Sequence, residues 1–179
     1  SYMPIRLIIS DLDGVLLNCK DIHFLALNQA LATIDPNLQI SPAEHTQTYD
    51  GLSTKAKLSL LHTSKGFPLQ HATTVNRLKQ AYTIELLKDF PSYNHTLKDT
   101  ILALKQQGYL FYVASNAIRD TIDLVLAKLD ITHLVDRIYS NEDVTNPKPN
   151  PEIYLRAMAD AGVAPTETLI IEDSKHGRE

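Results

Sequence analysis

Short apolar runs alternate with stretches of helical spacing at the start and in the second half of the chain. The runs are strand-sized and rich in β-branched or aromatic residues, which is typical of strands buried in a sheet. The predicted strands are 5–10, 109–115, 137–140 and 168–172. The predicted helices between them are 95–107, 118–129 and 151–161. Strands that alternate with helices favour right-handed crossovers and a parallel sheet with helices on both faces.

Residues 17–90 interrupt this alternation, because their apolar positions follow helical spacing with no convincing strand. Pro36 ends the first of these helices, and the capping-box sequence at 41–44 begins another. We therefore expect a three-layer, Rossmann-like α/β core with a parallel sheet. The core would comprise residues 1–16 and 91–179, with 17–90 inserted as an all-helical cap domain.

Composition narrows the class of protein. The chain has 179 residues, of which 44% are hydrophobic and 21% charged, as in ordinary globular proteins. No apolar run approaches the roughly 20 residues of a membrane-spanning helix, and residues 1–10 lack the pattern of a secretory signal. The single cysteine suits a reducing compartment, so we expect a cytoplasmic protein. A net charge of −4 without a basic stripe argues against nucleic-acid binding.

Polar residues with useful chemistry follow the predicted strands, where parallel α/β sheets bind their ligands. These residues are Asp11 and Asp13, Ser115 and Asn116, Glu172 and Asp173, and Lys148 in a proline-rich loop. Four converging carboxylates would repel one another unless a cation lay among them. Oxygen ligands without a His or Cys cluster suit Mg²⁺ better than zinc, and a lysine suits a neighbouring phosphate. The pattern therefore predicts a magnesium site beside a phosphate site.

Each of these features has an ordinary structural explanation when taken alone. A single Asp-x-Asp after an apolar run is usually not catalytic, and Ser115-Asn116 alone is more often a helix cap. Lys148 alone could be solvated, and Glu172-Asp173 alone could be a charge pair at a helix N-terminus. The occurrence of all four in order, at strand ends with helices between them, favours a functional site.

Four motifs in this order resemble the haloacid dehalogenase-like superfamily. They are DLDGVL (11–16), VASNA (113–117), the lysine of NPKPNPEIY (148) and LIIEDS (169–174). The resemblance covers nearly the whole chain. It is closest to the branch with a helical cap after the first motif, which includes β-phosphoglucomutase-like proteins and small sugar-phosphate phosphatases.

The resemblance implies a role for each motif. Asp11 would be the nucleophile that forms an aspartyl-phosphate, and Asp13 would be the general acid and base. The Mg²⁺ ligands would come from Asp11, Asp13, Glu172 and Asp173. The transferring phosphoryl group would be bound by Ser115, Asn116 and Lys148.

Three residues of the helical insertion are weaker candidates. His23 falls where this branch often carries a histidine, although a surface or helix-boundary histidine is an equal expectation. Gly51 lies in a stretch that resembles the branch's specificity loop, where Lys55 could reach a substrate phosphate or simply be solvated. The chain also ends soon after the fourth motif, where family members continue, so strand 168–172 is expected at a sheet edge.

The leading interpretation is a Mg²⁺-dependent phosphomonoester hydrolase that acts on a small phosphorylated metabolite as a monomer. The same residues could serve a sugar phosphomutase, which returns the phosphoryl group to its substrate. A non-catalytic binding protein on this fold is the third interpretation. The intact aspartate pair and lysine argue against it.

Overall fold

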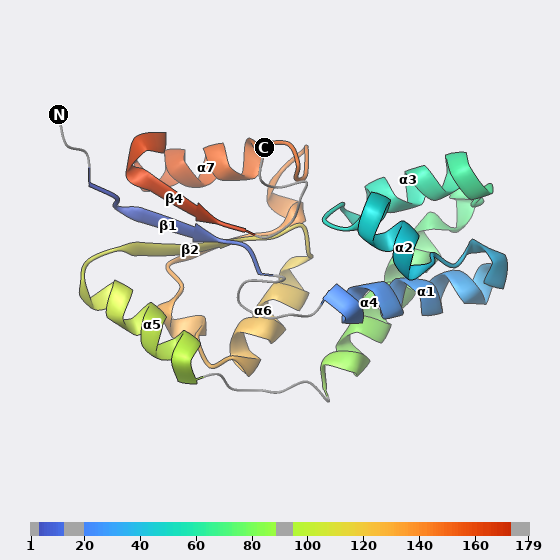
Figure 1. Cartoon of the computed structure of the whole chain (residues 1–179), viewed down its shortest axis with the longest axis horizontal. Coiled ribbons are helices and arrows are strands. Elements are labelled where there is room, and N and C mark those ends of the chain that lie inside the picture. The colour runs from blue at the N-terminus through green and yellow to red at the C-terminus, as the bar shows by residue number, and fades with distance from the viewer. Residues whose placement is uncertain (1–3, 13–19, 89–94, 173–179) are drawn as a thin grey trace. The chain divides into compact units, whose positions relative to one another are not determined.

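The computed structural model describes residues 4–12, 20–88 and 95–172 (Figure 1). The chain divides into two compact units. One comprises Ser1–Asn18 with Pro91–Glu179, and the other is Cys19–Phe90. We call them the sheet unit and the helical unit and describe each by itself. None of the helices in the described ranges is long and apolar enough to cross a membrane.

The sheet unit is built on four parallel strands in the order β3-β2-β1-β4. The strands are β1 (Leu7–Ser10), β2 (Leu110–Ala114), β3 (Arg137–Tyr139) and β4 (Thr168–Ile171). In the register of β1, Ser10 pairs with Val113 of β2 and with Ile171 of β4. The carboxyl ends of these three strands therefore meet at one edge of the sheet.

Helices cover both faces of this sheet (Figure 1), with α7 (Glu152–Ala161) on one face and α5 (His95–Gln106) and α6 (Arg119–Lys128) on the other. Because side chains alternate along a strand, each buried strand supplies both layers. The cluster against α7 consists of Leu7, Ile9, Tyr112, Ala114, Tyr139, Ile153, Tyr154, Ala157 and Met158. This arrangement confirms the predicted α/β fold class with a parallel sheet.

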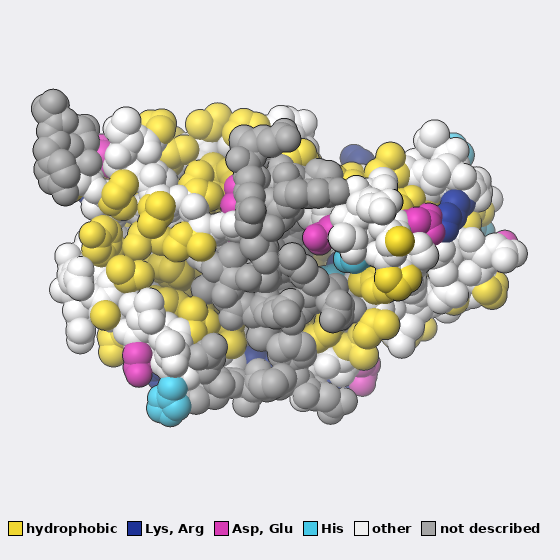
Figure 2. Space-filling model, viewed as in Figure 1, with side chains coloured by type: hydrophobic (Ala, Val, Ile, Leu, Met, Phe, Trp, Pro, Cys, Tyr) yellow, Lys and Arg dark blue, Asp and Glu magenta, His cyan; other side chains and the backbone are white. Residues whose placement is uncertain are grey.

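β4 is an edge strand of the sheet that the structure describes. Its side chains Leu169, Ile170 and Ile171 are 47%, 37% and 37% exposed. Figure 2 shows apolar side chains gathered on the side of the sheet unit that this view presents. The position of β4 at a sheet edge, with partly exposed apolar residues, agrees with the sequence prediction for this segment.

The described part of the helical unit contains helices and no strand, as its apolar spacing predicted. Its α-helices are α1 (Lys20–Ile34), α2 (Pro42–Glu44), α3 (Thr54–Lys65) and α4 (Ala72–Leu87). Ser41 and Glu44 form the predicted capping box, and the Ser53 side chain caps α3. The core lies between α1, α3 and α4 and includes Leu27, Leu31, Leu61, Phe67 and Val75, all almost fully buried.

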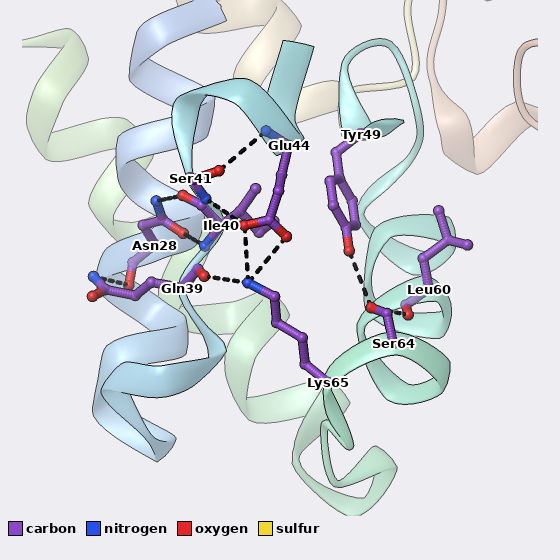
Figure 3. A network of polar contacts seen from close by, with 9 residues as sticks. All are labelled: Asn28, Gln39, Ile40, Ser41, Glu44, Tyr49, Leu60, Ser64 and Lys65. Atoms are coloured by element: carbon purple, nitrogen blue, oxygen red, sulfur yellow. Dashed lines mark hydrogen bonds and ion pairs between the residues drawn. The ribbon is translucent and has the colours of Figure 1, made fainter. Parts of the chain in front are cut away.

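A polar network fixes the segment between α1 and α2 (Figure 3). Asn28 of α1 donates from Nδ2 to the Ile40 carbonyl and accepts from the Ile40 N–H, both at 2.8 Å. Lys65 Nζ donates to the Gln39 carbonyl at 2.7 Å and forms an ion pair with Glu44 at 3.1 Å. The network thus satisfies backbone groups of an irregular segment that no helix or strand could satisfy.

We expect Asn28→Ala to lower the free energy of unfolding by about 2 kcal/mol, because it leaves both backbone groups of the buried Ile40 unsatisfied. Urea unfolding followed by circular dichroism measures this change. Gln29→Ala is the matched control, because Gln29 is the exposed neighbour on the same helix, and its expected effect is under about 0.5 kcal/mol. Equal effects for the two variants would contradict a structural role for the network.

Candidate active site

β1 delivers a buried carboxylate to the edge where the parallel strands end. The Asp11 N–H donates to the Ile171 carbonyl at 2.9 Å, which extends the pairing with β4 by one residue. Asp11 is 8% exposed, and its Oδ1 accepts the Leu12 N–H at 2.8 Å. Glu172 directly follows Ile171, so Asp11 and Glu172 leave the ends of neighbouring strands. These two carboxylates are 161 positions apart in the sequence.

Lys148 brings a buried positive charge to this carboxylate. Its Nζ lies 3.3 Å from Asp11 Oδ1 and donates to the Ala114 carbonyl at 2.8 Å. Lys148 is only 5% exposed, so water screens the ion pair poorly. An ammonium has three N–H donors, and these contacts use two of them. The third can be donated to a bound anion beside Asp11.

Two side chains fix the loop that carries Lys148. Asn116 accepts the Lys148 N–H at 2.9 Å and donates to the Lys148 carbonyl at 3.1 Å. On the α7 side, the Glu152 carboxylate accepts the N–H groups of Thr145 and Asn146 at 2.8 and 3.1 Å. These backbone hydrogen bonds hold the pKa of Glu152 below its usual value. The loop is therefore held from both sides, and the lysine is preorganised.

Ser115 lies buried at the end of β2. Its N–H donates to the Tyr139 carbonyl at 3.0 Å, and its Oγ accepts the Ala117 N–H at 3.0 Å. A hydroxyl has one proton and two acceptor positions. The Ala117 contact uses an acceptor position, so the hydroxyl proton can be donated to a ligand.

Tyr154 connects two of these groups, and its part in the site was missed in the sequence. Its hydroxyl donates to Glu172 Oε2 at 2.7 Å, and its ring centroid lies 5.0 Å from Lys148 Nζ. Burial, the Glu172 hydrogen bond and the nearby negative charges of Glu172 and Asp11 all raise the pKa of Tyr154, so its hydroxyl stays a donor. Its place in the NPKPNPEIY motif was the available signal, but only the lysine of that motif was taken as a site residue.

The described residues bring together five of the predicted site residues within the sheet unit. These are Asp11, Ser115, Asn116, Lys148 and Glu172. Two further predicted residues, Asp13 and Asp173, lie outside the described residues. The remaining candidates belong to the helical unit. There His23 is buried in α1, Gly51 has φ +83° and Lys55 is exposed in the first turn of α3.

The donors at the strand ends fit a hard divalent cation. Asp11 and Glu172 offer carboxylate oxygens, the ligand type that Mg²⁺ prefers. The Tyr154 hydroxyl occupies Glu172 Oε2 and leaves Oε1 of the same carboxylate for a cation. No group of three or more His, Cys, Asp or Glu ligands occurs within residues 4–12, 20–88 and 95–172. A complete ligand set would therefore need Asp13 and Asp173 as well.

Known proteins resemble this chain in sequence and fold. Pyrophosphatase PpaX of Bacillus cereus (strain AH820) is 26% identical over 174 residues, which cover 97% of this chain and 77% of that protein. CbbY of Rhodobacter sphaeroides, solved in complex with phosphate, has a TM-score of 0.84 at 20% identity, covering 97% and 80%. The β-phosphoglucomutase of Clostridium difficile has a TM-score of 0.82 at 22% identity, covering 97% and 78%. The two structures show a shared fold.

The sequence also matches a protein family as a whole, in addition to these single proteins. The match runs over residues 8–179, from β1 to the last residue, and so includes all four motifs that the sequence predicted. Because this match takes in all four motifs and the parallel sheet that carries them, the chain belongs to the haloacid dehalogenase-like hydrolases, a family of enzymes.

Proposed function

We propose that this hydrolase is a Mg²⁺-dependent phosphatase that cleaves a small phosphorylated metabolite through an aspartyl-phosphate. The observation that carries the proposal is the buried pair between Asp11 and Lys148, 3.3 Å apart at the carboxyl ends of the strands. A carboxylate beside a preorganised cation can attack a phosphoryl group whose own charge the cation offsets. A solvated surface pair could not supply this environment.

The proposed reaction has two steps. In the first, a carboxylate oxygen of Asp11 bonds to phosphorus as the bond to the leaving oxygen breaks, and Asp13 gives that oxygen its proton. In the second, Asp13 takes a proton from water, the water oxygen bonds to phosphorus and the bond to Asp11 breaks. The products are an alcohol and orthophosphate, and both aspartates return to their starting states.

Lys148 and Ser115 are proposed to bind the phosphoryl oxygens throughout both steps. Each has a proton that its contacts within the described residues do not use. Because Asn116 and Glu152 fix the loop before substrate binds, little reorganisation is needed when charge develops on phosphorus. The backbone amide of Asn116 is proposed as a further donor.

Mg²⁺ would be held by Asp11 and Glu172, together with Asp13 and Asp173. When bound, it would offset the charges of the carboxylates and of the phosphoryl group. Substrate selection is assigned to the helical unit, with His23, Gly51 and Lys55 as its candidate residues. The name of the PpaX relative makes pyrophosphate one of the compounds to test, beside sugar phosphates and other phosphomonoesters.

The test measures orthophosphate release from a panel of these compounds. With Mg²⁺ present, we expect release from at least one compound, and removal of Mg²⁺ with EDTA should lower the rate at least about 100-fold. Excess Mg²⁺ should restore it. EDTA already saturated with Mg²⁺ is the matched control and should have no effect.

Two outcomes would contradict the proposal. Release that persists in EDTA would show that no metal is needed. Conversion of one sugar phosphate isomer into another without orthophosphate would instead indicate a phosphomutase.

A further inference from the structure

Tyr154 lies between the two halves of the candidate site. It belongs to the first turn of α7, two residues after Glu152, which fixes the Lys148 loop. The side chain is buried in the cluster between α7 and the sheet and is 7% exposed. None of the proposed chemical steps uses it, yet it contacts a residue on the phosphate side and a residue on the metal side.

On the metal side, the Tyr154 hydroxyl holds one oxygen of Glu172. The hydrogen bond to Oε2 is 2.7 Å long, which is within the usual range for a hydroxyl that donates to a carboxylate. A glutamate side chain loses considerable rotamer freedom when it is fixed in one place. Because Tyr154 fixes the Glu172 side chain during folding, the cost of this lost rotamer freedom does not reduce the free energy of cation binding.

On the phosphate side, the ring of the same tyrosine faces the Lys148 ammonium. The distance from Nζ to the ring centroid is 5.0 Å, within the range of a cation–π contact. The Ala114 carbonyl and Asp11 Oδ1 contact the same ammonium. Three groups therefore restrict Nζ to a small volume beside Asp11.

We propose that Tyr154 is a positioning residue that sets Glu172 for the cation through its hydroxyl and Lys148 for the phosphoryl group through its ring. The inference rests on the proposed function for the identity of the two ligands. It predicts that the two contacts can be separated, because phenylalanine removes only the hydroxyl and leucine removes the ring as well.

The first measurement is Mg²⁺ binding by isothermal titration calorimetry on the full chain, with MgCl₂ as the probe. We expect Tyr154→Phe to raise the Mg²⁺ dissociation constant about 10-fold, since residues that orient metal ligands typically contribute 10- to 100-fold in affinity. The KM of this variant at saturating Mg²⁺ should stay within about twofold of the original. Tyr154→Leu should raise the dissociation constant of inorganic phosphate, measured at saturating Mg²⁺, as well.

Tyr139→Phe is the matched control. Tyr139 lies in the same buried cluster, and its hydroxyl also donates to a carboxylate, Asp160 Oδ2, at 2.7 Å. That carboxylate is on α7 and outside the candidate site. The control thus loses an equivalent hydrogen bond and should leave the Mg²⁺ dissociation constant unchanged.

Three outcomes would count against the inference. Equal Mg²⁺ affinities of the Tyr154→Phe and Tyr139→Phe variants would show that the Glu172 contact is only structural. Equal phosphate affinities of the phenylalanine and leucine variants would refute the role of the ring. An original chain that binds no Mg²⁺ would also overturn it. Mg²⁺ binding without turnover of any compound would refute the proposed function. The Mg²⁺ and phosphate dissociation constants of the variants would then still test the inference.

Discussion

Asp11→Asn is expected to lower kcat for orthophosphate release by about 10⁴-fold or more, because a neutral amide cannot form the proposed acyl phosphate. The substitution keeps the size of the side chain. An asparagine Oδ1 can still accept the Leu12 N–H, which lies 2.8 Å from Asp11 Oδ1. The variant should therefore fold, with a near-ultraviolet circular dichroism spectrum like that of the original chain. Steady-state phosphate release at saturating Mg²⁺ measures the loss.

Asp123→Asn is the control for this experiment. Asp123 forms an exposed ion pair with Arg119 on α6, at 2.9 Å, and its loss should leave kcat within about twofold. An Asp11→Asn variant that keeps more than about a tenth of the original kcat would exclude Asp11 as the nucleophile. In that case the aspartyl-phosphate mechanism would be wrong even if Mg²⁺ were required.

Lys148→Met is expected to impair both activity and stability. Loss of the ammonium removes a preorganised donor to the phosphoryl group, so kcat/KM should fall about 10²- to 10³-fold. It also leaves the buried Asp11 carboxylate without its cation, and the free energy of unfolding should fall by about 3 kcal/mol. Phosphate release and urea unfolding measure the two effects separately.

An exposed lysine pair in the same unit provides the comparison. Lys98 Nζ lies 2.6 Å from Asp130 Oδ2, with side chains that are 23% and 59% exposed. Lys98→Met should cost under about 1 kcal/mol and leave activity unchanged, because solvent screens this pair.

A double-mutant cycle tests whether the buried pair causes the destabilisation. In the Asp11→Asn and Lys148→Met double variant no unpaired charge remains, so it should be more stable than Lys148→Met alone. Additive losses in the cycle would show that the two side chains do not interact energetically.

Much of the fold could be predicted from the sequence because local patterns determine it. Near-continuous apolar runs can be buried only inside a sheet, and four of them became β1 to β4 within one or two residues. Helical spacing and the cap at Ser41 likewise specified elements of the helical unit. Parallel pairing followed from the alternation of strands and helices.

The same reasoning identified Asp11, Ser115 and Lys148 as candidates, because functional residues of parallel sheets follow the strands in the chain. Their residue type and their position after a strand are enough to make them candidates. Their roles stay predictions for the experiments above. Their arrangement in one cluster is a property of the sheet.

By itself, the sequence determined the family, the layered α/β architecture and which residues are candidates, because these depend on residue type and local spacing. Only the tertiary structure decided which groups meet. The contacts of Lys148 with Asp11 and of Tyr154 with Glu172 join residues 137 and 18 positions apart. Strand register and helix packing bring such residues together, and neither is encoded by local periodicity.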